Sequence, residues 1–338
     1  MPKQQSITPE ETEVYRTAES VSPKHPDKIC DQISDAILDA YLREDPFARV
    51  AVDVAGAHGK IFVAGEVTSK ATSVDIAAIV HRIAGPKADG TPLEIIESIE
   101  AQSPEIAQGV NTGGAGDQGI MVGYATNETP EYLPLEYVLA RNLNQYLYER
   151  WPYDGKTQVT LKGSAIVSIV ASFQHAATED LTEAVKEWAR TQNYVTKYFV
   201  KYQTANPTLH INPAGDWEVG GFDADSGLTG RKLAVDNYGP RVPLGGGAFS
   251  GKDGTKVDRS GAYIARKIAV DYLKKYDAHE VYIYLAYAIG YAHPVEATAI
   301  IDGIQKQIKG YDLTPEGIIK KLNLRAPGFE ARARYGHF

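Results

Sequence analysis

Apolar residues follow two periods along this chain. Apolar side chains at every second position of residues 50–54 and 61–63, with glycines between the two runs, predict a β-hairpin. Residues 159–161 and 166–173 predict a second hairpin, and further strands are expected at 233–235 and 281–289. Helical spacing predicts helices after Ser73 and at residues 135–148, 181–198 and 260–276. Hairpins that alternate with helices favour an α+β class, in which helices cover sheets.

The first helix is predicted to begin at Pro26 and to end near Leu42. Proline suits the first helical position, which makes His25 the expected N-cap residue. Cys30 lies inside this helix, and we expect its side chain to be packed. The apolar residues of the helix share one face and its aspartates point elsewhere: Ile29, Ile33, Ile37 and Ala40 against Asp31, Asp35 and Asp39.

Length and composition narrow the class of protein. At roughly 150 residues per domain, 338 residues suggest two domains or three small ones. A net charge of −8, from 35 basic and 43 acidic residues, argues against a nucleic-acid or anionic-membrane partner. No apolar run approaches the ~18 residues of a spanning helix, and the N-terminal residues lack an apolar signal core. A single cysteine favours a reducing compartment, so a cytoplasmic location is expected.

Residues 25–28, His-Pro-Asp-Lys, form the first candidate site. They begin a helix, where free N–H groups and the positive end of the dipole favour phosphate. His25 and Lys28 can meet phosphate oxygens, while Asp27 can hold a divalent cation. The alternative is a capping histidine beside an aspartate that the helix dipole favours, and both interpretations stay open.

Two further loops are rich in glycine. In residues 114–119 the alternating glycines let backbone approach a ligand, and Asp117 can accept a bond from a ribose hydroxyl, although spacing alone favours a simple turn. The stretch from Gly246 to Lys252 fits the phosphate loop of nucleotide hydrolases, but Asp253 stands where that motif needs Ser or Thr. We therefore reject that motif, which argues against an ordinary ATPase or kinase.

The loop at residues 245–260 still contains side chains that are suited to bind phosphate and a divalent cation. Lys252 and Lys256 supply point charges for phosphates, and Asp258 supplies a hard oxygen for Mg²⁺. The alternative is a solvated charged loop. Arg231 and Lys232 follow a turn and either clamp an anion or lie free on the surface. Since no nucleophilic triad and no close pair of histidines occurs, direct displacement on a nucleotide is favoured over covalent catalysis.

These stretches resemble the S-adenosylmethionine synthetase family. The carrying motifs are residues 25–36, 114–129 and 245–260, supported by residues 102–106, 227–232 and 286–290, in order from about residue 15 onward. The resemblance implies three similar α+β domains in a pseudo-threefold arrangement, each a β-sheet covered by helices. We place them at residues 1–112, 113–220 and 221–338.

The resemblance also implies an activity. Members join methionine and ATP by attack of the thioether sulfur on the ribose 5′ carbon, and the tripolyphosphate is cleaved to phosphate and diphosphate. They use Mg²⁺, two ions per site, and K⁺. They form a homodimer or a dimer of dimers, with active sites at the subunit interface.

Site residues follow from the matching motifs. The resemblance implies ATP contacts from His25, Lys28, Asp117, Asp154, Lys156, Trp217, Arg231, Lys232 and Lys252, with His25, Lys156, Arg231, Lys232 and Lys252 in catalysis. It implies a methionine pocket of Glu66, Gln108, Asp225 and Lys256, and Mg²⁺ ligands Asp27 and Asp258. Asp53 matches a K⁺ ligand that is usually glutamate, and its shorter side chain puts K⁺ binding in question.

The loop at residues 109–114 is shorter than the family's usual lid. A short loop weakens any claim of gated closure. It also motivates an alternative, a catalytically silent regulatory or assembly subunit of the same family. The intact set of His25, Asp27, Lys252 and Asp258 argues against that alternative.

Overall fold

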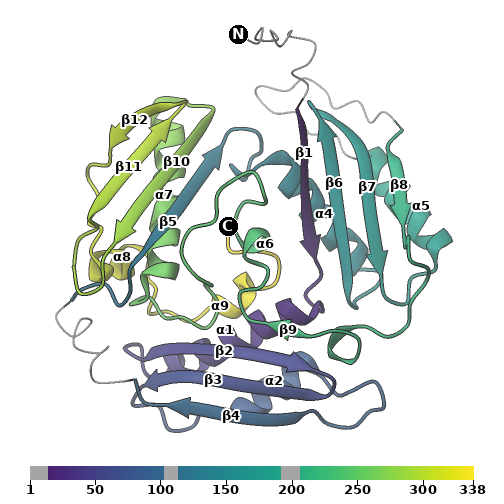
Figure 1. The fold of residues 1–338 in the computed structure, drawn as a ribbon, viewed down its shortest axis with the longest axis horizontal. Helices are drawn as coiled ribbons and strands as arrows, with labels where there is room; N and C mark the ends of the chain where they lie inside the picture. The colour runs from purple at the N-terminus through teal and green to yellow at the C-terminus, as the bar shows by residue number, and fades with distance from the viewer. Residues whose placement is uncertain (1–13, 103–112, 192–205) are drawn as a thin grey trace, which may run out of the picture.

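Three four-stranded sheets frame the described part of the protein and surround the C-terminal end of the chain (Figure 1). The computed structural model describes residues 14–102, 113–191 and 206–338. Helices pack against each sheet, which confirms the predicted α+β class with three sheet-and-helix units.

The first sheet has the order β4-β3-β2-β9. Its centre is the predicted hairpin, formed by β2 (Arg49–Ala57) and β3 (Lys60–Thr68). β4 (Glu94–Glu100) and the short β9 (Gly227–Leu228) lie at the two edges. The buried valines of β2 face α1 (Pro26–Glu44), while α2 (Ile76–Ala84) packs against α1. The opposite face of this sheet is largely exposed.

The second sheet has the order β1-β6-β7-β8. It contains the second predicted hairpin, and its strands are β1 (Tyr15–Val21), β6 (Gly155–Lys162), β7 (Ala165–Phe173) and β8 (Thr208–Ile211). α4 (Leu135–Tyr148) and α5 (Thr178–Thr191) cover it, and they enclose a separate apolar core. The last part of the helix predicted at 181–198 lies outside the described residues.

The third sheet has the order β12-β11-β10-β5. Its strands are β5 (Gly119–Thr126), β10 (Glu280–Tyr287), β11 (Glu296–Ile301) and β12 (Ile304–Gln307). α7 (Val257–Tyr276) packs across β5 and β10, and α8 (Pro315–Leu322) packs on α7. The shorter helices are η2 (Gly221–Asp223), α6 (Leu233–Asp236) and α9 (Phe329–Arg332).

Each sheet takes an edge strand from a distant part of the chain (Figure 1). β1 pairs antiparallel with β6, β5 pairs with β10, and β9 pairs with β2. The sheets therefore do not follow contiguous blocks of sequence. This exchange ties the segments at residues 25–28 and 227–232 to one place, because β9 joins the same sheet that α1 covers.

One predicted strand is wrong. Residues 233–235 belong to the helical turn α6. A run of three apolar residues is too short to show a period, and the turn buries both Val235 and the neighbouring Asp236 carboxylate. In the described residues, no helix is long and apolar enough to cross a membrane.

Candidate active site

His25 begins the first helix, as predicted. It has extended backbone angles, and its Nδ1 accepts a hydrogen bond from the Asp27 backbone N–H at 3.2 Å. Because Nδ1 accepts, a neutral ring carries its proton on Nε2. Burial, together with the nearby ammonium groups of Lys232 and Lys156, lowers the pKa of His25 to about 4, although the Asp27 carboxylate opposes this shift. The ring is therefore neutral at pH 7.

Asp27 joins two motifs that are 200 residues apart. Its Oδ1 accepts from Arg231 Nε at 2.8 Å and from the Leu228 backbone N–H at 3.0 Å, and its Oδ2 accepts from Lys232 Nζ at 2.6 Å. The carboxylate is fully buried. Burial alone would raise its pKa, but these donors outweigh burial, so the pKa lies below its ordinary value and Asp27 stays ionised.

Lys156 at the start of β6 and Asp154 just before it lie near His25 and Asp27. Lys156 lies across from β1 and pairs with Glu19 at 3.1 Å, with both side chains about half exposed. Asp154 accepts a hydrogen bond from the Gly221 backbone N–H at 3.1 Å. Burial raises the pKa of Asp154 to about 6, and the negative charges of Asp225 and Asp27 act in the same direction although backbone hydrogen bonds oppose them.

Asp154 also lines a cavity of about 510 Å³. The cavity lies between the C-terminal end of α2 and residues 218–223. Trp217 stands beside it, since a Cβ added at Gly220 would approach the Trp217 ring to 2.9 Å. An apolar and partly charged hollow beside a carboxylate suits a nucleoside.

Arg231 and Lys232, which pair with Asp27, form the first cationic group. Lys252 and Lys256 of the glycine-rich loop form the second cationic group. Lys252 Nζ lies 2.7 Å from Asp258 Oδ2, and Asp258 Oδ1 accepts the Gly247 backbone N–H at 2.7 Å. Lys256 Nζ lies 2.5 Å from Asp253 Oδ2. Gly251 has φ +80°, and a Cβ there would come within 1.9 Å of the Val52 carbonyl oxygen. Glycine is thus required where this loop crosses β2.

The two cationic groups are neighbours. A Cβ added at Gly230 would come within 2.3 Å of the Ala248 Cβ, so the loops at 227–232 and 245–258 are in contact. Both loops are also held by α1, because Asp31 accepts the Gly230 N–H at 2.8 Å and Asp35 accepts the Gly251 N–H at 2.9 Å. The helix that carries Asp27 therefore fixes both loops.

Asp53 and Glu66 lie on the exposed face of the first sheet. Partial desolvation raises the pKa of Asp53, Lys252 opposes this rise, and Glu66 adds to it. Asp225 acts on the pKa values of His25 and Asp154, which places it near the first cationic group. Glu66 therefore lies near Asp53, and Asp225 lies near His25 and Asp154, whereas Gln108 lies outside the described residues.

Two predicted ATP contacts, Lys28 and Asp117, have different surroundings: Lys28 is buried and Asp117 is exposed. Lys28 is fully buried and pairs with Asp31 at 3.0 Å and with Asp236. The expectation that it contacts ATP is corrected here, because its ammonium has no access to solvent and already joins two carboxylates. Asp117 is exposed, and its carboxylate accepts the Gln118 backbone N–H at 2.7 Å.

The carboxylates fit Mg²⁺ in the presence of a nucleotide. Among the described residues, no group of three or more His, Cys, Asp or Glu side chains is placed to hold a metal ion. Mg²⁺ is commonly held by one or two carboxylates together with substrate phosphates and water. Asp27 and Asp258 can each supply one such carboxylate. Both are buried and paired with basic side chains, so those side chains must turn to the phosphates if the metal is to bind.

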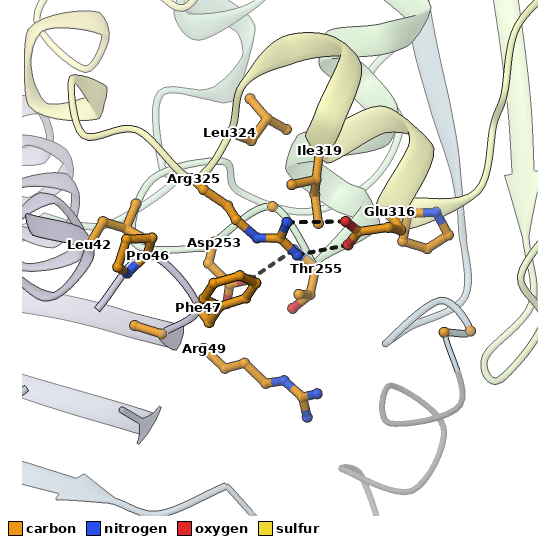
Figure 2. Close-up of a pocket in the computed structure, with 15 residues that line it drawn as sticks. Leu42, Pro46, Phe47, Arg49, Asp253, Thr255, Glu316, Ile319, Leu324 and Arg325 are labelled. Atoms are coloured by element: carbon orange, nitrogen blue, oxygen red, sulfur yellow. Dashed lines mark hydrogen bonds and ion pairs between the residues drawn. The ribbon is translucent and has the colours of Figure 1, made fainter. Parts of the chain in front are cut away.

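Figure 2 shows a different pocket, of about 190 Å³, which is not the predicted site. Arg325 crosses it, donating to both Glu316 oxygens at 3.1 and 2.7 Å and lying 4.3 Å from the Phe47 ring centroid. Asp253 and Thr255 of the glycine-rich loop line it, but none of the predicted ligands does. The predicted catalytic residues lie elsewhere, at the N-terminal end of α1 and on the two loops that α1 holds.

Family models and curated relatives match this chain along most of its length. The S-adenosylmethionine synthetase N-terminal, central and C-terminal domain models match residues 13–104, 112–217 and 219–338. The chain is 42% identical over 367 aligned positions to the S-adenosylmethionine synthase of Clostridium tetani, covering 95% of this chain and 93% of the relative. It is 43% identical over 369 positions to that of Pseudothermotoga lettingae, with the same coverage, and 42% identical over 353 positions to that of Mycoplasmopsis synoviae, covering 95% and 91%.

These matches define a three-domain enzyme of the adenosyl-transferring class. The chain belongs to the S-adenosylmethionine synthetase family.

Proposed function

We propose that this protein synthesises S-adenosylmethionine from methionine and ATP. The thioether sulfur attacks the ribose 5′ carbon, and the leaving tripolyphosphate is then cleaved to phosphate and diphosphate. The observation that supports this most strongly is the convergence of Arg231, Lys232 and Lys252 on loops that one helix holds together. Three cations on loops that touch each other can neutralise part of the charge of a triphosphate.

The leaving group is the centre of the proposed mechanism. Positive charge builds on sulfur and negative charge builds on the triphosphate, so donors that are already in place stabilise the transition state. Arg231, Lys232 and Lys252 bind the phosphate oxygens, and Lys156 approaches from β6. Mg²⁺, held by Asp27 and Asp258, supplies further charge neutralisation when it is bound.

His25 fits the role of a neutral donor. With Nδ1 occupied by the Asp27 N–H, its Nε2–H is left to donate to the oxygen that leaves the 5′ carbon. The attacking sulfur has no proton to lose, so this step needs no general base. Asp154 and Trp217 fit the ribose and the adenine, while Glu66, Gln108, Asp225 and Lys256 fit methionine.

A second copy of the chain completes the proposal. Asp53 and Glu66 lie on the exposed sheet face, which also presents the apolar side chains of Phe62, Ile96 and Leu228. We propose a homodimer or a dimer of dimers with the active site at the interface, a cytoplasmic location, and a K⁺ site at Asp53.

A product assay tests the proposed function. Purified protein with saturating Mg²⁺, ATP and methionine is expected to give the sulfonium product together with phosphate and diphosphate, detected by mass spectrometry. ATP hydrolysis that does not depend on methionine would favour an ATPase instead. Absence of any product would favour the catalytically silent subunit that the short 109–114 loop suggests.

A further inference from the structure

α1 carries a row of four buried aspartates at four-residue spacing. Four-residue spacing places side chains along one side of a helix. Each carboxylate in the row accepts backbone N–H groups from a loop that is distant in sequence: Asp27 from Leu228, Asp31 from Gly230, Asp35 from Gly251, and Asp39 from Gly328, Phe329 and Glu330. All four are at most 2% exposed. The row therefore holds successive loops against one helix.

Asp35 has the contacts that bear most directly on Lys252. Its Oδ1 accepts the Gly251 N–H at 2.9 Å and Arg259 Nη1 at 2.8 Å, and its Oδ2 accepts Arg259 Nη2 at 2.7 Å. Arg259 Nη1 also donates to the Lys252 carbonyl at 2.9 Å. The backbone is thus held on both sides of the Lys252 Cα by one buried, two-pronged ion pair.

We propose that Asp35 and Arg259 are positioning residues that set the Lys252 ammonium for the leaving triphosphate. Lys252 has a flexible side chain, so its backbone must be fixed if the ammonium is to be placed reproducibly. Arg259 also follows Asp258 directly in the first turn of α7, so the same pair anchors the proposed Mg²⁺ ligand. This inference rests on the proposed function.

If Asp35 only stabilised the fold, its loss would lower the rate no more than the loss of any similarly buried carboxylate. Asp39 of the same helix supplies the matched control. Asp39 lies in the same row, is equally buried and accepts three backbone N–H groups, but those belong to residues 328–330, which hold none of the predicted ligands. Asp39→Asn therefore removes a similar buried carboxylate from the same helix without removing a hydrogen bond to the Lys252 loop. The link of Asp39 to that loop is indirect, because the centroid of the Phe329 ring lies 4.6 Å from the Arg259 guanidinium.

The test compares Asp35→Asn with Asp39→Asn in the full-length protein. Arg259→Lys is a second variant, because it keeps the charge but loses the forked geometry. Melting temperature, kcat, and the KM values for ATP and methionine are measured for each. A misplacement of about 1 Å lowers rates about 100-fold, so we expect Asp35→Asn and Arg259→Lys to lose about 100-fold in kcat while the methionine KM changes less than about threefold.

Asp39→Asn is expected to lower the melting temperature comparably and to keep kcat within about threefold of wild type. The inference is overturned if Asp35→Asn and Arg259→Lys keep wild-type kcat, if Asp39→Asn loses kcat equally, or if neither Asp35→Asn nor Arg259→Lys folds. Lys252→Ala separates the role of the Lys252 ammonium from the role of the residues that position it. An inactive wild type contradicts the proposed function. A fully active Lys252→Ala contradicts the role of Lys252 at the leaving group, whereas an inactive Lys252→Ala beside an active Asp35→Asn contradicts only the positioning role.

Discussion

Replacing Lys252 by alanine separates a catalytic role from a structural one. The Lys252 side chain is 22% exposed and makes one ion pair, with Asp258. Because only 9% of the Asp258 side chain is exposed, this pair contributes somewhat more than a fully exposed one, about 1 to 2 kcal/mol. Asp258 keeps its bond from the Gly247 N–H, and the Lys252 backbone keeps the Arg259 bond. Stability should therefore fall little, by about 3 °C at most in melting temperature.

The rate should respond far more. Losing one preorganised charge at the leaving group lowers kcat by about 100- to 1,000-fold. The assay measures S-adenosylmethionine formation under saturating substrates beside a thermal melt, with Lys320→Ala, an exposed lysine of α8, as the control. A loss of activity that only follows a large fall in melting temperature would refute the reasoning and make Lys252 structural.

Three further predictions follow from single positions. Asp53→Glu should increase the ratio of rates with and without K⁺, and an unchanged ratio would count against a cation site there. Because the pKa of Asp154 is about 6, its carboxylate becomes protonated and loses its negative charge as pH falls from 7 to 5. Binding of 5′-methylthioadenosine, which has no group that titrates in that range, should weaken accordingly in calorimetry, and Asp154→Asn should remove the dependence; equal slopes would contradict the ribose assignment. Gly251→Ala should destabilise the protein by about 3 kcal/mol or more in denaturant unfolding, since it combines a positive φ with a Cβ 1.9 Å from a carbonyl oxygen; a change below about 1 kcal/mol would contradict this.

Local features of the fold were predictable because their causes are local. The alternating valines of β2 and the proline after His25 define a hairpin and a helix start without reference to the rest of the chain. The pairing of β1 with β6 was not predictable in this way. It joins residues more than 130 positions apart, and alternation shows which face is buried but not which strand lies alongside.

The charged side chains of α1 show the same limit. The apolar stripe indicated one buried face, whereas the helix is buried nearly all round, since α2, α9, β2 and β9 all contact it. Its carboxylates are tolerated there because distant loops supply donors. The four-residue spacing from Asp27 to Asp39 was the available signal. The place of Lys28 at the start of the helix favours a phosphate contact, and its buried partner Asp236, 208 residues away, cannot be inferred from the local sequence.

The most direct test of the central claim is the product analysis with Mg²⁺-ATP and methionine, run with and without K⁺. The structure leads us to expect a sulfonium product that requires both substrates, with phosphate and diphosphate formed in equal amounts. ATP turnover without methionine, or no turnover of the purified chain, would contradict that claim.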